Sequence, residues 1–377
     1  MTWRPLLVLV VFAAALVASV PSAGASRGML IGLLDEAALY DNPAQIYPVL
    51  QQARTQVLRV NLYWGGRSGV ARRRPAQATD PDDPAYNWAL YDRTVNYAAQ
   101  HRIRLLFSIF GTPSWANGGK AVNVAPTRAR DLRDFAYAAA RRYSGSHVGA
   151  DGRALPPVRY WLAWNEPNYP IGLVPQFRRV GGGYVVQSAI DYARICTAIY
   201  DGVKRTLIRN QRVGCGVTGP RGNNQPRSSR PTVSPIVFMR ALKKAGLRRF
   251  DAYAHHPYYG NRTETPTTRP ASTAITLANI DVLAQELSRL WGPKRIWITE
   301  YGYQTNPPDR IFGVSFTRQA AYLRQAFTLA RRHPRIDMML WFLLRDEPNL
   351  GGWQSGLITR TGRRKPAFNV FRALPRV

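Results

Sequence analysis

Two glutamates each follow a short apolar run of the chain. A carboxyl group can act as an acid or base by donating or accepting a proton, or as a nucleophile toward carbon. Glu166 stands in the sequence Trp-Leu-Ala-Trp-Asn-Glu-Pro-Asn, and Glu300 ends the run Arg-Ile-Trp-Ile-Thr-Glu. Hydrolysis of a glycosidic bond needs one carboxyl group to protonate the leaving oxygen and a second that attacks or activates water. Taken singly, Glu166 also fits a surface turn fixed by Pro167, so the hypothesis depends on the pair.

The surroundings of the two glutamates predict different ionisation states. Trp161 and Trp164 precede Glu166, and partial burial among aromatic rings would raise the pKa of its carboxyl group and keep it protonated. Arg59 lies inside an apolar run, where a charge is costly unless it is paired. We therefore expect Arg59 to pair with Glu300 and to hold it as a carboxylate. A purely structural ion pair would explain the same two residues.

Apolar, β-branched runs alternate with amphipathic stretches along the chain after residue 25. The predicted strands are 29–33, 57–62, 104–110, 158–164, 212–217, 250–255, 295–299 and 336–342. The predicted helices are 44–56, 87–101, 128–143, 188–208, 236–245, 273–290, 316–331 and 367–374. Strands that each lead into a helix are the pattern of a closed parallel (β/α)8 TIM barrel, an α/β fold. A doubly wound sheet is the alternative, but no glycine-rich fingerprint follows the first strand.

The loops after the predicted strands are long and rich in glycine, proline and aromatic residues, whereas the connections that lead into strands are mostly short. A barrel carries its active site on the loops at the C-terminal ends of its strands. Glu166 and Glu300 follow the fourth and the seventh predicted strand, so we expect them to meet at that end. Without a repeat or a second domain in the pattern, we assign residues 26–377 to one catalytic domain.

The ordered set of motifs resembles clan A glycoside hydrolases, and the Trp-Asn-Glu-Pro-Asn form is most similar to families thirty-nine and five. The Asn-Glu-Pro motif around Glu166 and the position of Glu300 match that clan, and Arg59 falls where the clan has a second-strand arginine. The resemblance covers nearly all of residues 28–375. It implies a retaining double displacement with Glu166 as acid/base and Glu300 as nucleophile, their carboxyl groups roughly 5 Å apart.

The same resemblance implies a set of residues that bind substrate. Asn165 would hydrogen-bond a sugar 2-hydroxyl, and His256 and Tyr258 are similar to the sixth-strand pair that braces the two carboxyl groups. Trp115 lies in a segment that resembles the clan's loop after the third strand. Trp341 falls where an eighth-strand aromatic residue forms the floor of the sugar subsite. The implied substrate-binding residues are Arg59, Asn165, Trp115, His256, Tyr258 and Trp341.

Other residues near the predicted strand ends have two interpretations. The acidic ones are substrate contacts or, more often, helix caps and acceptors of loop amides. They are Asp35, Glu36, Asp346 and Glu347. His255 contacts either sugar or the protein core. Aromatic rings pack on the C–H faces of sugars, and we expect about half of the aromatic candidates to touch ligand. These are Trp64, Trp115, Tyr301, Tyr303 and Trp353.

The first 25 residues have the composition of a secretory signal peptide. Arg4 precedes the apolar run Leu6–Val20, and the small residues that end at Ala25 suit cleavage there. A membrane anchor is the alternative, but this run is shorter than the roughly 20 residues that span a bilayer. We therefore expect a secreted, extracellular protein with no stable membrane insertion after cleavage, and with cell-wall association as one form of that location.

The net charge of +30 at pH 7 comes mostly from arginine, since only six of the 52 basic residues are lysines. The arginines are spread along the chain in pairs and triplets without a nucleic-acid reader motif, so we expect no nucleic-acid partner. A solvated basic surface would explain them. Attraction to an acidic wall polymer or an anionic cell surface is the alternative.

Two cysteines, Cys196 and Cys215, lie in a predicted helix and in the strand that follows it. Export would permit a disulfide, and the sequence leaves a bridge and two buried thiols as equal alternatives. Neither cysteine has the spacing of a metal ligand, and the chain shows no ligand cluster at a recognised spacing. We predict no cofactor and no catalytic metal.

These observations predict a secreted retaining β-glycosidase that hydrolyses O-glycosidic bonds of an extracellular or cell-wall glycan, so the expected partner is a carbohydrate. One alternative is an exo-acting β-xylosidase or β-glucosidase, although family thirty-nine xylosidases carry an extra β-sandwich for which no residues remain here. A second is a barrel that binds carbohydrate without cutting it. A third is a basic adhesin, whose binding would weaken steeply with salt.

Overall fold

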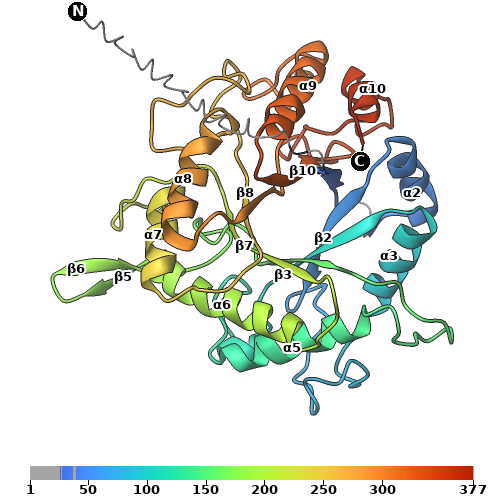
Figure 1. Ribbon diagram of the computed structural model, residues 1–377, viewed down its shortest axis with the longest axis vertical. Helices are drawn as coiled ribbons and strands as arrows, with labels where there is room; N and C mark the ends of the chain where they lie inside the picture. The colour runs from blue at the N-terminus through green and yellow to red at the C-terminus, as the bar shows by residue number, and fades with distance from the viewer. Residues whose placement is uncertain (1–25, 27, 37–39, 377) are drawn as a thin grey trace, which may run out of the picture.

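A computed structural model describes residue 26, residues 28–36 and residues 40–376. Its main sheet closes into a barrel in which every neighbouring pair of strands is parallel (Figure 1). Around the barrel run β1 (Leu30–Leu34), β2 (Val57–Tyr63), β3 (Arg104–Phe110), β4 (Tyr160–Ala163), β7 (Arg212–Thr218), β8 (Ala252–His255), β9 (Arg295–Ile298) and β10 (Ile336–Phe342). The TIM-barrel prediction is therefore confirmed.

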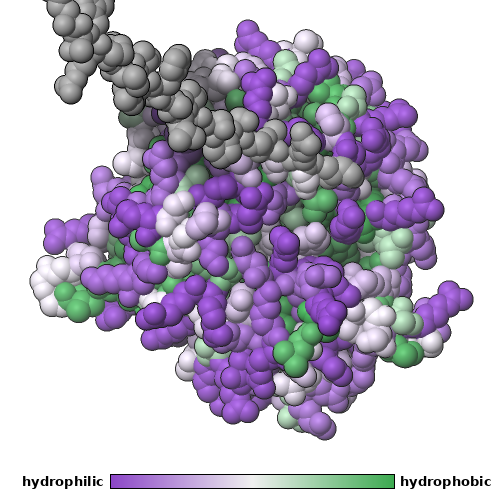
Figure 2. Space-filling model, viewed as in Figure 1, coloured by the Kyte–Doolittle hydropathy of each residue, from purple (hydrophilic) through white to green (hydrophobic). Residues whose placement is uncertain are grey.

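Helices surround the barrel (Figure 1). They are α2 (Pro43–Gln52), α3 (Ala89–Gln100), α4 (Ser114–Asn117), α5 (Ala129–Arg142), α6 (Gln187–Lys204), α7 (Pro235–Lys244), η1 (Leu277–Asn279), α8 (Ile280–Trp291), α9 (Phe316–Arg332) and α10 (Pro366–Ala373). In α5, Leu132, Phe135, Ala136 and Ala139 recur at helical spacing and are all fully buried. Such a stripe packs one face of the helix against the interior and leaves residues such as Arg130 in water, whereas Arg142 at the end of the helix is buried in ion pairs. Hydrophilic residues cover most of the face that Figure 2 shows.

Alternate residues of each barrel strand point inward and outward. The inward residues Val57, Leu106 and Leu340 belong to a cluster that fills the barrel, while the outward ones pack against the helices. In β2 the inward series that begins at Val57 continues with Arg59 and then Asn61. The apolar filling therefore gives way to polar side chains toward the C-terminal ends of the strands.

One element departs from the sequence prediction. The loop after β4 contains a two-stranded antiparallel hairpin, β5 (Phe177–Val180) and β6 (Gly183–Val186), which projects beside the barrel (Figure 1). The hairpin pairs only with itself, and its residues are exposed or half-buried. It therefore lacks the apolar pattern by which the barrel strands were predicted.

Cys196 on α6 and Cys215 on β7 form a disulfide, with their Cα atoms 6.0 Å apart. The bridge decides the alternative that the sequence left open, and it fastens the outer layer to the barrel. In the part of the chain that the structure describes, no helix has the length and apolar character needed to cross a membrane. The signal peptide predicted for residues 1–25 lies outside the described residues.

Candidate active site

Polar side chains gather at the C-terminal ends of the barrel strands. Arg59 lies on β2, Asn165 and Glu166 follow β4, His256 follows β8, and Glu300 follows β9. The closed parallel barrel brings these ends together, so that Arg59 and Glu300 touch although 241 positions separate them. The structure thus assembles the residues on which the glycosidase prediction depends.

Arg59 is completely buried and holds two strand ends together. Its Nη1 donates to Glu300 Oε1 at 2.9 Å and to the carbonyl oxygen of Thr299 at 3.2 Å. Its Nη2 donates to Asn165 Oδ1 at 2.7 Å, which leaves the NH2 group of that amide for the cavity. A buried guanidinium needs such partners. The same contacts compensate the charge of Glu300, whose side chain is only 11% exposed.

Tyr258 holds the other oxygen of Glu300. Its hydroxyl group donates to Glu300 Oε2 at 3.1 Å. Burial, and secondarily the nearby carboxylates, raise the pKa of this hydroxyl well above its ordinary value, so it remains a donor. Because Arg59 and Tyr258 each take one oxygen, the Glu300 carboxylate is fixed in orientation.

His256 connects Arg59 to Glu166. Burial lowers the pKa of the imidazole to about 3, so the ring is neutral at physiological pH. Its Nε2 lies 3.1 Å from Arg59 Nη1 and its Nδ1 lies 3.0 Å from Glu166 Oε1. Because a guanidinium can only donate, Nε2 accepts and the proton of the neutral ring resides on Nδ1. His256 therefore donates a hydrogen bond to Glu166.

Burial changes the acidity of Glu166. Burial raises the pKa of this group to about 7, against an opposing effect of Arg59. Its side chain is 17% exposed, so it still reaches the cavity. The predicted difference in ionisation therefore has a physical basis, since desolvation favours the neutral acid at Glu166. A general acid works best when its pKa lies near the working pH.

The backbone around Glu166 is held in an uncommon conformation. Glu166 has a φ of 38° and Trp164 a φ of 72°, in the left-handed region that non-glycine residues rarely adopt. Asn168 is completely buried, and its amide donates to the carbonyl oxygens of Gly219 and Val233 at 3.2 and 2.9 Å. Its Oδ1 accepts from the Gly219 amide at 2.8 Å. Asn168 thus ties the loop that carries Glu166 to the loop after β7, a positioning contact that sequence reasoning missed.

The two carboxyl groups are close. One oxygen of Glu166, one oxygen of Glu300 and a ring nitrogen of His256 all lie within 4.8 Å of one another. This spacing suits direct attack by one carboxylate, whereas inverting enzymes keep roughly 6.5–9.5 Å between the groups to admit a water. Such a cluster could also hold a metal ion, but Arg59 places a positive charge against two of its three members. The arrangement therefore suits acid–base and nucleophilic chemistry better than metal ligation.

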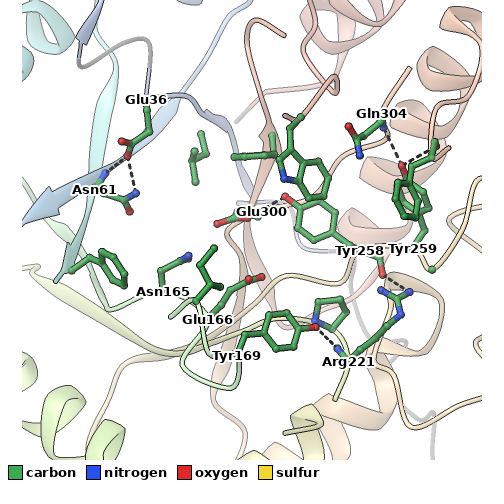
Figure 3. Close-up of a pocket in the computed structure, with 18 of the residues that line it drawn as sticks. Glu36, Asn61, Asn165, Glu166, Tyr169, Arg221, Tyr258, Tyr259, Glu300 and Gln304 are labelled. Atoms are coloured by element: carbon green, nitrogen blue, oxygen red, sulfur yellow. Dashed lines mark hydrogen bonds between the residues drawn. The ribbon is translucent and has the colours of Figure 1, made fainter. Parts of the chain in front are cut away.

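A cavity of about 720 Å³ opens above these residues, and Glu166, Glu300, Asn165 and Tyr258 line it. Figure 3 shows that the two sides of this cavity differ in their residues. Glu36 and Asn61 lie on one side of Glu300, and Tyr169 and Arg221 lie beyond Glu166 on the other. The aromatic rings of Phe342 and Trp353 complete the wall. The volume is in the range of small-molecule sites.

Glu36 is a third carboxyl group in this cavity. Its Oε1 accepts from Asn61 Nδ2 at 2.7 Å, and its Oε2 accepts from the Tyr63 hydroxyl at 3.0 Å. Burial raises the pKa of Glu36. The Asn61 Oδ1 atom is buried without a hydrogen-bond partner in the described part of the chain. An unpaired buried acceptor is costly, and the Glu36 carboxyl group, which lines the cavity, is the acceptor that a ligand can reach.

Two aromatic residues that the resemblance implied as substrate-binding lie outside the cavity, which corrects the sequence prediction, while Arg59 and His256 lie beneath it against the two carboxyl groups. Trp341 is completely buried and donates from Nε1 to the Ser355 carbonyl oxygen. It has the outward position of β10, so Phe342, its inward neighbour, lines the cavity instead. Trp115 donates to the Ala71 carbonyl oxygen and packs edge-on against Trp64 in the wall behind the site.

The remaining aromatic candidates divide as follows. Trp353 lines the cavity, with its ring centroid 5.1 Å from that of Tyr258. Trp64, Tyr301 and Tyr303 are buried in the core. Trp353 is therefore the candidate that a sugar ring in the cavity can reach.

The remaining polar candidates have structural partners. His255 is a core residue whose ring nitrogens contact Thr218 Oγ1 and the Ile275 carbonyl oxygen. Asp35 accepts from two loop amides, and Asp346 forms a buried ion pair with Lys365 at 2.7 Å. Glu347 accepts from the Trp353 amide. Of the four acidic candidates, Glu36 lines the cavity, contrary to the capping role favoured from sequence.

Comparison with known proteins gives the fold a context. Residues 238–376 match a family of unknown function, DUF5722. Among the curated proteins none matches the sequence. The structure is similar to a family 39 glycoside hydrolase from Bacteroides cellulosilyticus WH2, with a TM-score of 0.60 and 19% identity, over 91% of this chain and 62% of the other. The present chain thus spans less than two thirds of that relative's length.

Two further solved structures share the barrel. A glucosidase from Croceicoccus marinus has a TM-score of 0.64 and 15% identity, over 93% of this chain and 68% of that one. The catalytic domain of GH30 xylanase C from Talaromyces cellulolyticus has a TM-score of 0.56 and 12% identity, over 93% and 76% of the two chains. At these identities the likeness establishes the fold, and it agrees with the resemblance noted in the sequence.

Proposed function

We propose that this protein is a retaining β-glycosidase in which Glu300 is the nucleophile and Glu166 the acid/base. The observation that carries the proposal is the asymmetry of the pair. Glu300 is charge-compensated by Arg59 and oriented by Tyr258, whereas burial raises the pKa of Glu166 to about 7. Their oxygens lie within 4.8 Å of each other, which suits double displacement.

The reaction has two steps. In the first, a Glu300 oxygen bonds to the anomeric carbon while the glycosidic C–O bond breaks, and Glu166 gives its proton to the departing oxygen. In the second, Glu166, now a carboxylate, takes a proton from water, whose oxygen bonds to the anomeric carbon and releases Glu300. A pKa of about 7 suits both roles, because the group can lose and regain its proton near neutral pH.

The neighbours of the pair act by orientation. His256 is neutral and donates from Nδ1 to Glu166, so it fixes that side chain without adding a charge that would lower its pKa. The free NH2 of Asn165 faces the reacting sugar, where it can donate to the 2-hydroxyl group. Trp353 offers a ring face for the sugar.

The partner in this proposal is an extracellular or cell-wall glycan, and the protein acts outside the cell. The Cys196–Cys215 disulfide supports that location, since disulfides persist in oxidising compartments. The apolar run Leu6–Val20 is the second support. An exo-acting β-xylosidase or β-glucosidase is a narrower form of the same proposal, and a set of aryl β-glucosides, β-xylosides and β-galactosides distinguishes these specificities.

The decisive test is covalent labelling by activated 2-deoxy-2-fluoro-β-glycosides, followed by mass spectrometry of the peptides. We expect the label on Glu300, and we expect Glu300→Gln to lose the label and at least about 10⁴-fold in kcat, as nucleophile removal does in other hydrolases. Glu286→Gln is the matched control, because this residue lies on α8, pairs with Arg240 and Arg289 away from the cavity, and should keep full activity.

A label on another residue, or a product released first as the α-anomer in a time-resolved NMR experiment, would overturn the assignment. Carbohydrate binding that is unchanged in Glu300→Gln, with no labelling and no turnover in the parent protein, would establish the non-catalytic barrel instead.

A further inference from the structure

A second cavity lies at the opposite end of the barrel, where the strands begin. Its volume is about 660 Å³. Arg104 and Arg212 are the first residues of β3 and β7, and Arg159 immediately precedes β4. These three arginines line the cavity together with Tyr160, Trp297 and Asp337, and we call it the lower cavity.

The arginines of the lower cavity have little negative charge near them. The Arg104 side chain is exposed and has no hydrogen-bond or ion-pair partner in the described residues. Arg159 donates only to carbonyl oxygens, at 3.0 Å to Ser144 and 3.5 Å to Val158. Arg212 reaches Asp337 only at 3.8 Å.

The single carboxylate of this cavity is already engaged. Asp337 Oδ1 accepts from Arg295 Nε at 2.9 Å. Three arginines therefore line a space whose one carboxylate already binds Arg295. A bound anion would be attracted by the positive charge that this carboxylate leaves unneutralised.

One aromatic ring of the lower cavity is accessible. Tyr160 is half-buried and lines the cavity, and its ring lies edge to face with the buried Trp297, with centroids 5.9 Å apart. A ring beside several guanidinium groups provides two kinds of contact at once. The ring accepts the C–H face of a sugar, and the guanidinium fork binds a carboxylate or phosphate in a bidentate manner.

We propose that the lower cavity binds an acidic unit of a polysaccharide, a sugar that carries a carboxylate or a phosphate, and so tethers the protein by the end opposite Glu166 and Glu300. A cavity of this volume accommodates one or two sugar units and leaves the catalytic cavity free. It is a local recess of limited size, whereas binding to a nucleic acid requires contacts along a backbone. The proposal goes beyond the glycosidase activity and stands whether or not the chain cleaves glycans.

The test is titration calorimetry of the full chain with trigalacturonate, its uncharged methyl ester and a glycerol-phosphate oligomer. We expect binding of at least one of the two anionic probes and none of the ester, and the tighter of the two identifies the acid group. The triple variant R104Q/R159Q/R212Q should weaken that binding at least tenfold. Asp337→Asn should tighten it severalfold, because it removes the competing carboxylate.

The matched control is R194Q/R248Q/R324Q, which removes the same charge from exposed positions elsewhere. We expect its affinity to stay within twofold, and both triple variants to keep the parent's rate on a neutral aryl glycoside. Equal loss in the two triple variants would overturn the proposal in favour of a diffuse basic surface. Tighter binding of duplex DNA that depends on the same three arginines would overturn it as well. We expect Asp337→Asn to bind the probe more tightly than the parent protein, and a misfolded variant could not produce that gain in affinity.

Discussion

The two ends of the barrel carry opposite charges, and the charged side chains differ in their exposure to water and in their partners. At the C-terminal ends, Glu36, Glu166 and Glu300 are largely withdrawn from water, and protein donors hold each of them. At the N-terminal ends, the lower cavity has three arginines and one carboxylate, that of Asp337, and two of these arginines are exposed. The same eight strands therefore end in a buried acidic site and begin in a hydrated basic one.

The difference shows what desolvation adds to a charge. Burial moves the pKa of Glu166 to about 7, which makes its proton available to a reaction at neutral pH. An arginine stays charged in every surrounding that a protein offers. The basic end can therefore attract and orient a ligand, but it cannot exchange protons with it. Chemistry is expected at one end and recognition alone at the other.

The largest loss of activity that tests this contrast is expected at Glu166. We expect Glu166→Gln to lower kcat about 10²–10⁴-fold on substrates with poor leaving groups, since the amide cannot act as a general acid. In the parent protein kcat/KM should fall tenfold per pH unit above about pH 7, because the raised pKa of Glu166 marks the loss of the catalytic proton. A pH–rate profile checks both statements. Persistence of the same alkaline decline in Glu166→Gln would assign it to another group.

A smaller effect is expected at Glu36. Its side of the cavity offers the oxygens of the Glu36 carboxyl group, which suit the hydroxyl groups of a sugar. We expect Glu36→Gln to lower kcat/KM about tenfold, mainly through KM, in line with the loss of a hydrogen bond to a charged group. Kinetics on a series of deoxy-glycosides measures this loss. The substrate that lacks the contacted hydroxyl should lose nothing more in the variant, and additive losses for every member of the series would contradict the contact.

The smallest effect is expected at Trp115, which lies at the acidic end but outside its cavity. Trp115→Phe should change kcat/KM less than about twofold and lower the free energy of unfolding by about 1 kcal/mol, because the hydrogen bond to Ala71 is lost. Steady-state kinetics and thermal unfolding measure the two quantities. A tenfold loss of kcat/KM in a variant with an unchanged melting temperature would place Trp115 in the substrate site after all.

The barrel was predictable because the sequence pattern of a strand followed by a helix is repeated along the chain. Each strand is a short apolar run and each is followed by a helical period, so the eight runs and the long loops after them agree with one fold. The predicted run 104–110 coincides with β3, and the run 336–342 with β10. The strand count places Glu166 and Glu300 at the C-terminal ends of the fourth and seventh predicted strands. The pairing of Arg59 with Glu300 was predictable because an unpaired charge is costly inside an apolar strand.

The facing of individual side chains was not predictable in the same way. Strands of a parallel barrel are buried on both faces, so the residues of both faces are apolar. The sequence therefore does not show which residues of a strand point into the barrel and which point outward. The resemblance implied Trp341, and the apolar pattern of β10 does not show that Phe342 is the residue that points inward. The role of Glu36 depends on Asn61 and Tyr63, which reach it only after β1 and β2 pair. The disulfide likewise depends on a Cα distance that no spacing in the sequence fixes.

The positive φ of Glu166 sets stability against function at a single residue. A non-glycine residue in this region costs about 1–3 kcal/mol, and glycine would adopt it without that cost. This cost is a noticeable share of the roughly 5–15 kcal/mol by which folded domains are stable. A barrel that needed only to be stable would gain from glycine here, so this turn is a place where stability and the proposed activity oppose each other.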